Sequence, residues 1–261
     1  MKKLLALVTW FIFVGVGSIC AQTETDILYK KHTFELGPEI SYRTYKEPDV
    51  VRERGTMYGL VASYTYHNKI MLKAEATGSM GWYHYSGSGQ IDNIRDIRGL
   101  GGYDFSVLKS SILTPYIGIG YRHLNDDFAG NTSAIYGLVE RDSTNIYSPI
   151  GIGLITGLGN DWSIGGTGEY DLFWSGKQIS YIPVTGSNNA YNQVGNSQKN
   201  GYGLRGSITL EKKYKKVIFE VGPSIIYWNI KGSETNGIAI GYPREPKNNS
   251  TEVGIKLAIK Y

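Results

Sequence analysis

The chain has 261 residues, of which 41% are hydrophobic and 19% charged, and its formal net charge is +4. A disordered chain would carry more charge and fewer aromatic residues, and a helical membrane protein would show repeated apolar runs of about 20 residues, so the sequence fits neither class. The 34 glycines and 21 tyrosines instead favour a fold built from many strands.

The amino terminus has the features of a secretory signal peptide. Lys2 and Lys3 precede an apolar stretch at residues 4–16, and small residues follow as far as Ala21. A basic, an apolar and a small-residue region in this order are typical of a signal that is removed during export. We therefore predict a signal peptide at residues 1–21.

Two alternatives for this segment stay open. It could remain as a signal anchor, although it is short for a permanent span. Cys20 could also become the acylated first residue of a lipoprotein, but the bulky Ile19 before it fits that processing poorly. Cleavage after Ala21 removes the single cysteine, so no internal disulfide can form, and two lysines, which lowers the charge from +4 to +2. So small a charge gives no reason to expect a nucleic-acid partner.

Beyond the signal peptide, runs of about ten residues alternate apolar side chains with polar ones or glycine, which is the period of a β-strand. In the first run Phe34, Leu36 and Ile40 share one face, whereas Glu35 and Glu39 share the other. The same pattern predicts ten strands, at about residues 32–45, 56–67, 70–84, 94–105, 112–124, 145–156, 162–175, 201–211, 216–230 and 250–261.

The connections between these strands alternate in length. Short ones lie near residue 68 and at 107–111, 157–161 and 212–215, and longer ones lie at 46–55, 85–93, 125–144, 176–200 and 231–249. An even strand count with short turns on one side is typical of an outer-membrane barrel. We predict an all-β fold, a ten-stranded antiparallel up-and-down transmembrane β-barrel with short periplasmic turns and long extracellular loops. Residues 32–261 form this single domain, and residues 22–31 form a short periplasmic segment before it.

Closure follows because an open sheet would leave two unpaired edges, which lipid does not tolerate. The apolar face then meets the membrane lipid, and aromatic residues near the strand ends form the interfacial girdles. We expect these girdle residues to include Tyr42, Tyr45, Tyr64, Tyr66, Trp82, Tyr103, Phe105, Trp162, Trp174 and Tyr227. The alternative is a soluble carrier barrel with its apolar face inside, but the signal peptide and the unbroken apolar bands favour the membrane.

The last ten residues resemble the carboxy-terminal signal by which outer-membrane barrels are recognised for insertion. Gly254, Leu257, Ile259 and the terminal Tyr261 stand at matching places, although a terminal Phe is commoner. The resemblance implies the barrel-insertion machinery as a partner and the bacterial outer membrane as the location.

The inward face carries acids and bases together. A predicted polar network in the lumen comprises Glu35, Glu39, Arg43, Lys73, Glu75, Arg98, Arg122, Glu169, Asp171, Arg205, Glu220 and Glu252, with Asp104, Glu211 and Lys256 on the same face. Because a wide aqueous channel needs roughly 16 to 18 strands, mixed charges in so narrow a barrel should pair and fill it. We expect a plugged lumen, with a narrow channel for ions or small solutes as the alternative.

The hairpin from Tyr147 to Tyr170, with its Ser-Pro-Ile-Gly and Trp-Ser-Ile-Gly-Gly runs, is similar to part of the barrel of the omptin family of outer-membrane proteases. The resemblance implies a similar barrel architecture. Omptins use an aspartate pair on one loop and an aspartate–histidine pair on another, because an activated water needs a base and an oriented imidazole. Here residues 176–200 contain no Asp, Glu or His, and residues 85–93 offer only Asp92. No catalytic residue carries over, so we expect no enzyme, and an omptin-like hydrolase is the least favoured alternative.

Metal and cofactor chemistry have little support. His123 stands beside Asn125, Asp126 and Asp127, but the alternation turns His123 outward, so we expect no metal site. The Gly-x-Gly spacings fall inside strands and not before helices, which gives no phosphate-binding loop and no expected cofactor.

The remaining hypothesis is that surface loops on a rigid barrel carry the function. The segment at 179–184 mixes aromatic and aliphatic residues within an Asn-, Gln- and Ser-rich stretch, which suits contact with a protein or a glycan. Folding of this loop over the barrel opening is an equally good explanation of the same residues. We therefore expect a structural or binding protein whose partners are membrane lipid and a surface protein or glycan.

Overall fold

The computed structural model of the chain describes residues 28, 30–48, 51–85, 88–127, 140–183, 191–233 and 245–261. The predicted signal peptide at 1–21 and most of the predicted segment at 22–31 lie outside these residues. Within the described part of the chain, no helix is long and apolar enough to cross a membrane.

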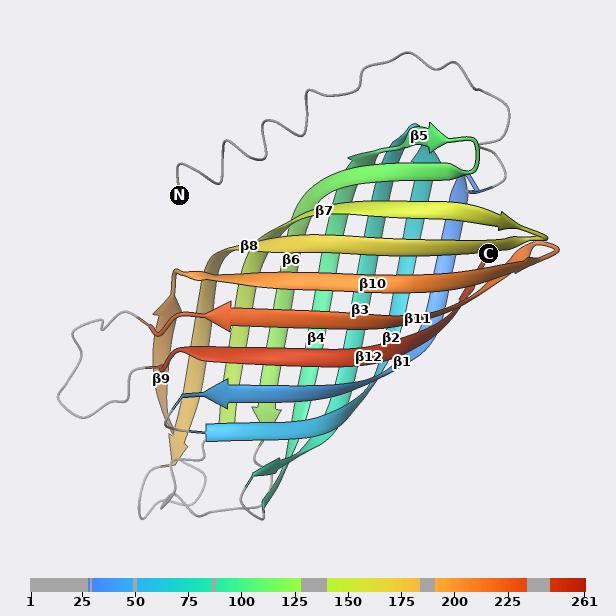
Figure 1. Ribbon diagram of the computed structural model, residues 1–261. Helices are drawn as coiled ribbons and strands as arrows, with labels where there is room; N and C mark the ends of the chain where they lie inside the picture. Colours follow the sequence, from blue (N-terminus) through green and yellow to red (C-terminus); the bar gives the residue numbers. More distant parts are fainter. Residues whose placement is uncertain are drawn as a thin grey trace.

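The described residues form twelve strand segments that build one antiparallel sheet (Figure 1). These are β1 (His32–Glu47), β2 (Val51–Asn68), β3 (Ile70–Tyr85), β4 (Ser88–Tyr103), β5 (Phe105–Leu108), β6 (Ser111–Asp127), β7 (Glu140–Gly159), β8 (Trp162–Pro183), β9 (Tyr191–Gln198), β10 (Gly201–Tyr214), β11 (Val217–Ile230) and β12 (Asn248–Lys260).

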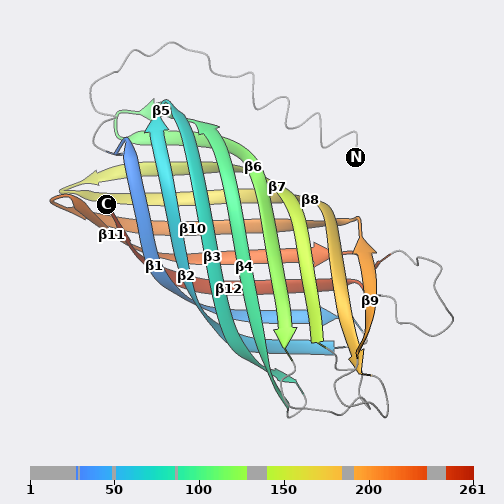
Figure 2. The ribbon, with the colours of Figure 1, turned by 180° about the vertical axis from the view of Figure 1, so that it is seen from behind.

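The sheet closes into a barrel of ten strands. β4 and β5 are one barrel strand interrupted at Asp104, and β9 lies in line with β10, pairing the outer part of β8 while β10 pairs its inner part. Closure occurs between β1 and β12, where the backbone N–H of Phe34 donates to the carbonyl of Tyr261 at 3.0 Å and the N–H of Tyr261 donates back at 2.8 Å. The predicted ten-stranded antiparallel fold is confirmed, and Figure 2 shows its far wall.

The two faces of the strands differ as the alternation predicts. Phe34, Leu36 and Tyr42 on β1 are exposed on the outside, whereas Glu35 and Arg43 of the same strand are buried. Such an apolar exterior is stable only against lipid or another apolar surface. The same contrast runs around the barrel, so the polar side chains line the lumen.

One end of the barrel is made of tight turns, and we call it the short-turn end. Lys69 alone joins β2 to β3, Asn160 and Asp161 join β7 to β8, and Lys215 lies in the turn after β10. These four residues have φ between 50° and 63°. Asn and Asp tolerate this left-handed conformation better than most residues, which suits them to such turns. We call the opposite end, where β9 stands, the mouth (Figure 1).

Two of the longer predicted connections are much shorter in the structure. β1 and β2 remain paired up to Glu47 and Val51, and β3 and β4 up to Tyr85 and Ser88, so the predicted loops at 46–55 and 85–93 are mostly strand. These strand ends extend past the apolar band. The residues that this adds to β2 and β4, at 51–55 and 88–93, are mainly polar residues and glycine, so the alternation of apolar and polar residues gives no signal there.

The predicted loop at 176–200 is also wrong in part. β8 continues to Pro183 and pairs with β9, so residues 179–183 are strand and not loop, and Val184 lies outside the described residues. Gln178 and Ser180 are buried on the inner face of this hairpin. The register of β8 shifts near Trp174, which ends the regular alternation that the prediction followed.

Tyr45 is a second correction. It was expected in the outer aromatic girdle, but its hydroxyl donates to Glu47 at 2.8 Å, and both side chains lie on the inner face of β1. Tyr45 comes three residues after Tyr42, which faces outward. Because successive side chains of a strand point to opposite faces, this odd spacing places Tyr45 on the inner face. Tyr42, Trp82, Trp162 and Trp174 are exposed on the outside as expected.

Candidate functional site

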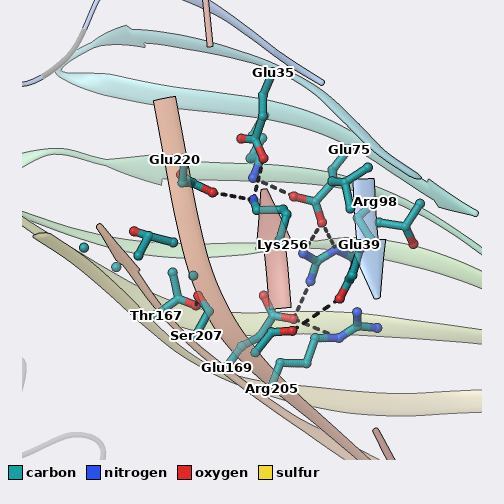
Figure 3. Close-up of a pocket in the computed structure, with 18 of the residues that line it drawn as sticks. Glu35, Glu39, Glu75, Arg98, Thr167, Glu169, Arg205, Ser207, Glu220 and Lys256 are labelled. Carbon is teal, nitrogen blue, oxygen red and sulfur yellow. Dashed lines mark hydrogen bonds and ion pairs between the residues drawn. The ribbon is translucent and has the colours of Figure 1, made fainter. Parts of the chain in front are cut away.

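In the described part of the chain, charged side chains from many strands meet in the lumen. Near the short-turn end, Lys256 on β12 lies between Glu35 and Glu220, with its Nζ 2.8 Å from the Glu220 carboxylate (Figure 3). Lys260, four residues further along β12 on the same face, contacts Glu220 and lies 2.7 Å from Glu211 on β10. Three acids and two lysines thus form one ion-pair cluster across four strands.

In the middle of the lumen Arg98 on β4 joins two walls. Its Nε donates to Glu75 on the neighbouring β3 at 3.1 Å, and its Nη1 donates to Glu169 on β8 at 2.6 Å (Figure 3). Lys73 lies 2.5 Å from the same Glu75. Since β4 and β8 are not neighbours in the sheet, the Arg98–Glu169 pair spans the lumen.

Arg205 on β10 makes a second span. It lies 2.6 Å from Asp96 on β4 and 2.7 Å from Asp171 on β8, and its Nη2 donates to the hydroxyl of Tyr147 at 2.9 Å. Tyr147 in turn donates to Asp96 at 2.6 Å. Each of these groups is buried, and each has a charged or hydrogen-bonded partner, which is the condition under which buried charge is tolerated.

An aromatic layer lies on the mouth side of this network. The rings of Tyr147 and Trp228 meet edge to face with centroids 5.1 Å apart, and Phe173 and Ile230 complete the cluster. The guanidinium of Arg122 lies 5.4 Å from the Trp228 ring centroid. Cations favour aromatic faces at this distance, so Arg122 and Trp228 stabilise each other across the lumen.

This aromatic layer was not predicted from the sequence. β11 carries the run Ile225-Ile226-Tyr227-Trp228, which is apolar on both faces, and β7 around Tyr147 has the same property. Such a run could have predicted the layer. Only one face of a strand can meet lipid, so apolar residues on the other face must pack inside the lumen.

The mouth holds a second charged cluster, beyond the apolar band. It consists of the carboxylates of Glu47, Glu53, Asp92, Asp126 and Glu245 around the guanidiniums of Arg43 and Arg141. Arg43 lies 3.2 Å from Asp92, and Arg141 on β7 lies 2.6 Å from Glu47 on β1. Five acids thus face two bases in a buried space.

This excess of acid changes the proton affinity of the cluster. Burial raises the pKa of Glu53 to about 7, and repulsion from Asp126 adds to the effect. Burial also raises the pKa of Glu245 to about 7, where Arg141 opposes the effect and Glu47 reinforces it. Both carboxyl groups therefore hold their protons to higher pH than free glutamate does.

Glu245 fastens the segment that leads into β12. Its carboxylate accepts a hydrogen bond from the Gln178 side chain on β8, and its backbone N–H donates to the Ser233 hydroxyl at 3.0 Å. The backbone N–H of Ser233 donates back to the Glu245 carbonyl at 3.0 Å. The start of β12 is thereby tied to the β8–β9 hairpin over the mouth.

Between the short-turn end and Arg122 the lumen contains a cavity of about 330 Å³. Its wall on β7, β8, β10 and β11 is built from small residues, among them Gly153, Gly165, Thr167, Ser207 and Gly222. The hydroxyls of Thr167 and Ser207 lie 2.7 Å apart and face the open space (Figure 3). Small side chains on this wall leave the space that the charged side chains of the opposite wall do not fill.

The structure places all twelve residues of the predicted lumen network on the inner face, buried or half-buried. Nine of them form ion pairs with described residues, namely Glu35, Arg43, Lys73, Glu75, Arg98, Glu169, Asp171, Arg205 and Glu220. Among the same described residues Glu39, Glu252 and Arg122 have no ion-pair partner.

The residues of the proposed insertion signal lie on both faces of β12. Leu257, Ile259 and Tyr261 are exposed on the outside. Gly254 faces inward, where a Cβ atom would come within 2.9 Å of the Ile40 carbonyl. Recognition by insertion machinery stays a prediction.

The histidines are distributed around the barrel. His67 lies 2.8 Å from Asp104 inside the lumen, and His123 lies 2.5 Å from Asp142. In the ranges that the structure describes, no three His, Cys, Asp or Glu side chains are grouped so as to hold a metal ion.

No family model matches the sequence, and no curated protein matches it either. Solved structures do. The outer-membrane protease OmpT from Escherichia coli aligns over 88% of this chain and 96% of its own, with 9% identity and a TM-score of 0.54. The translocator domain of the autotransporter NalP from Neisseria meningitidis covers 98% of this chain and 93% of its own at 9% identity and a TM-score of 0.45. The toluene transporter TodX from Pseudomonas putida covers 89% of each chain at 10% identity and a TM-score of 0.41.

At these identities the likeness concerns the fold. OmpT is the neighbour with a TM-score above 0.5 among these three, and the barrel architecture expected from the omptin resemblance is confirmed. Taken with the closed sheet, the apolar exterior and the polar lumen, the chain has the ten-stranded barrel fold of outer-membrane proteins.

Proposed function

We propose that this chain is an integral outer-membrane barrel with a closed lumen, acting through its mouth as a structural or binding protein. The contacts across the lumen carry this proposal. Arg205 with Asp96, and Arg141 with Glu47, each join strands that are not neighbours in the sheet. Since wide pores need roughly 16 to 18 strands, a ten-stranded barrel leaves little free cross-section beside such contacts.

The location is part of the proposal. The exterior is apolar between aromatic residues such as Trp162 near the short turns and Trp174 nearer the mouth, a pattern that favours insertion in a bilayer. With export by the predicted signal peptide, the short-turn end would face the periplasm and the mouth the cell exterior. Fractionation of cells, followed by gels of unboiled and boiled samples, tests this: a folded barrel in the outer-membrane fraction migrates faster before boiling.

The mouth supplies the surface for a partner. The β8–β9 hairpin stands there, and the connections at 128–139, 184–190 and 234–244 leave from it. Connections on a rigid barrel carry binding functions because the scaffold fixes their ends. We infer that the partner is a surface protein or a glycan.

The binding role is tested by replacing these three connections, one at a time, with short turns. Loss of cell-surface adhesion by at least one folded variant is expected. The hairpin turn at Lys69, at the opposite end of the barrel, provides the matched control when Lys69 is changed to Gly. Adhesion that is unchanged in all three folded variants would count against binding by the mouth.

Closure of the lumen is tested by conductance. Folded protein in a planar bilayer should give no stepwise current. Steady single-channel steps from the unchanged protein would contradict a closed lumen.

A narrow channel for ions or small solutes is the second candidate. The observation that favours it is the 330 Å³ cavity, which lies on the short-turn side of the aromatic layer. For this function the aromatic layer of Tyr147 and Trp228 would have to move aside. Conductance of the unchanged protein that ends when Trp228 is cross-linked to the opposite wall would establish it.

We propose no catalytic role. Proteolysis of the omptin type needs an imidazole facing the carboxylates of the mouth. His123 on β6 pairs instead with Asp142, on the outer face of its strand pair. A peptide-library digest with folded protein tests this proposal, and cleavage that disappears in the Asp92→Asn variant would overturn it.

A further inference from the structure

Three charged side chains of the cavity wall differ from the rest. The other acids, lysines and arginines that the strands contribute to the cavity form ion pairs, but among the described residues Glu39, Glu252 and Arg122 form none. A charge that is removed from bulk water and left without a partner destabilises the folded protein. These three residues line the same cavity, so a molecule in it can contact them.

The two carboxylates lie on adjacent strands and repel each other. Each accepts one hydroxyl hydrogen bond: Ser224 donates to Glu39 at 3.3 Å, and Ser41 donates to Glu252 at 2.5 Å. Neither serine neutralises a charge. Both carboxylates keep lone pairs that can accept a further hydrogen bond.

Gly254 leaves the space beneath this pair of acids. A Cβ atom at that position would come within 3.2 Å of the Glu39 carboxylate and 2.8 Å of the Ser41 Cβ. The glycine thus lets the Glu39 carboxylate lie against the backbone of β12. The result is a niche with four oxygen-bearing side chains, in which no cation of the described residues forms an ion pair with Glu39 or Glu252, although Lys256 stands opposite Glu39 in the register.

Arg122 supplies the opposite charge at the same end of the cavity. Its side chain is only 4% exposed, and the Trp228 ring covers one side of its guanidinium. Asp96 and Glu252 attract it, but the ion pair of Asp96 is with Arg205. The five N–H donors of this guanidinium have no acceptor among the described residues, and a bound carboxylate would satisfy two of them in parallel.

We propose that this end of the cavity binds a small molecule carrying both an ammonium group and a carboxylate, the chemistry of an amino acid. The ammonium lies between Glu39 and Glu252 and donates to their carboxylates and to the serine hydroxyls. The carboxylate of the ligand pairs with Arg122. The three protein charges sum to −1, so a ligand of net charge 0 or +1 is favoured over an anion.

Size and access agree with this ligand class. A cavity of about 330 Å³ is at the lower end of the range for small-molecule sites, which is roughly 300 to 1,000 Å³. Its lining continues to Thr33 and Lys30 at the short-turn end, whereas the aromatic layer covers the mouth side. The ligand therefore enters from the short-turn end.

The test is titration calorimetry on the full mature chain refolded in detergent. L-lysine and L-serine are the probes, and n-butylamine and succinate are the comparators, each of which carries only one of the two charge types. We expect saturable binding of L-lysine, somewhat weaker binding of L-serine, and at least tenfold weaker binding of both comparators. No heat from either amino acid with folded protein would overturn the proposal, and so would equal binding of n-butylamine.

Variants locate the site. Glu39→Gln with Glu252→Gln, and separately Arg122→Gln, should each weaken L-lysine binding at least tenfold, because one end of the ligand loses its partner. Glu211→Gln, at the short-turn end of the same cavity, is the matched control and should bind normally. If the double variant does not fold, Ser224→Ala is measured in its place, and it should weaken L-lysine binding severalfold. Unchanged affinity in the folded variants would overturn the assignment. Conductance is measured separately, so a failure here is distinct from a failure of the closed-lumen proposal.

Discussion

The guanidinium of Arg141 on β7 lies 2.6 Å from the carboxylate of Glu47 on β1, on opposite sides of the barrel mouth. The pair is fixed further by the Tyr45 hydroxyl, which donates to the same carboxylate oxygen. A contact between strands so far apart in the sheet holds the mouth to one width. It also makes the mouth sensitive to the loss of a single side chain.

The first prediction concerns this pair. Arg141→Ala leaves the Glu47 carboxylate buried without its cation, which should lower the free energy of unfolding by about 3 kcal/mol. Urea unfolding in detergent, followed by tryptophan fluorescence, measures the change. Lys177→Ala, an exposed lysine on β8 close to the mouth, is the control and should stay within about 0.5 kcal/mol of the unchanged protein.

The second prediction is a pH dependence of the mouth. Because Glu53 and Glu245 have a pKa of about 7 in the folded mouth and about 4.5 when exposed, the folded state binds more protons between these values. Stability of the mouth is therefore greatest in acid and falls as the pH rises from about 4.5 to about 7.

Hydrogen exchange of the amides at 245–250, measured at several pH values, checks this dependence. Protection should fall across the window, and the Glu53→Gln, Glu245→Gln double variant should keep its protection at neutral pH because it has no proton to lose. Protection that rises with pH in the unchanged protein would contradict the raised pKa values.

A third prediction addresses the hydroxyl of Tyr147. It donates to Asp96 and accepts from Arg205, so Tyr147→Phe removes two hydrogen bonds and leaves a charged donor short of an acceptor. We expect a loss of about 2 kcal/mol in urea unfolding. Tyr121→Phe, on the exposed outer face of β6, should show almost none, and an equal loss in both variants would contradict a role for the buried network.

The fourth prediction compares two glycines. A Cβ at Gly120 would meet the Tyr147 ring at 2.2 Å, whereas a Cβ at Gly78 would have open space around it. Gly120→Ala should therefore displace the ring and cost about 1 to 3 kcal/mol, as overpacking does. Gly78→Ala should be neutral or slightly stabilising, since alanine restricts the unfolded chain. The two melting midpoints, measured side by side, decide the matter.

Much of the fold could be predicted because a membrane barrel imposes period two on its sequence. The runs that hold Phe34 or Trp162 show that period clearly, and all ten barrel strands lie within a few residues of their predicted positions at one end or both. At the mouth the prediction failed for β9 and for the first residues of β2 and β4, which begin at Val51 and Ser88. These strand ends lie beyond the apolar band, so the contact with lipid that imposes the alternation is absent.

The candidate site was predictable only in part. Alternation places Glu39 and Arg122 on the inner face, but it does not say which charges will pair. That choice depends on which strands face each other across the lumen, a consequence of closure that no local pattern carries. The aromatic layer was not predicted for a related reason. Trp228 lies in a run with apolar residues on both faces, and such a run does not show which residue faces the lumen.

The partners of Arg205 have a consequence for assembly. This residue lies on β10, and its carboxylate partners Asp96 and Asp171 lie on strands synthesised earlier, with Asp96 being 109 residues away. A partly inserted sheet that lacked β10 would hold these acids in the bilayer without their cation, at a cost of several kcal/mol each. A stable half-barrel is therefore disfavoured, and insertion should be cooperative, with the strands entering the membrane together.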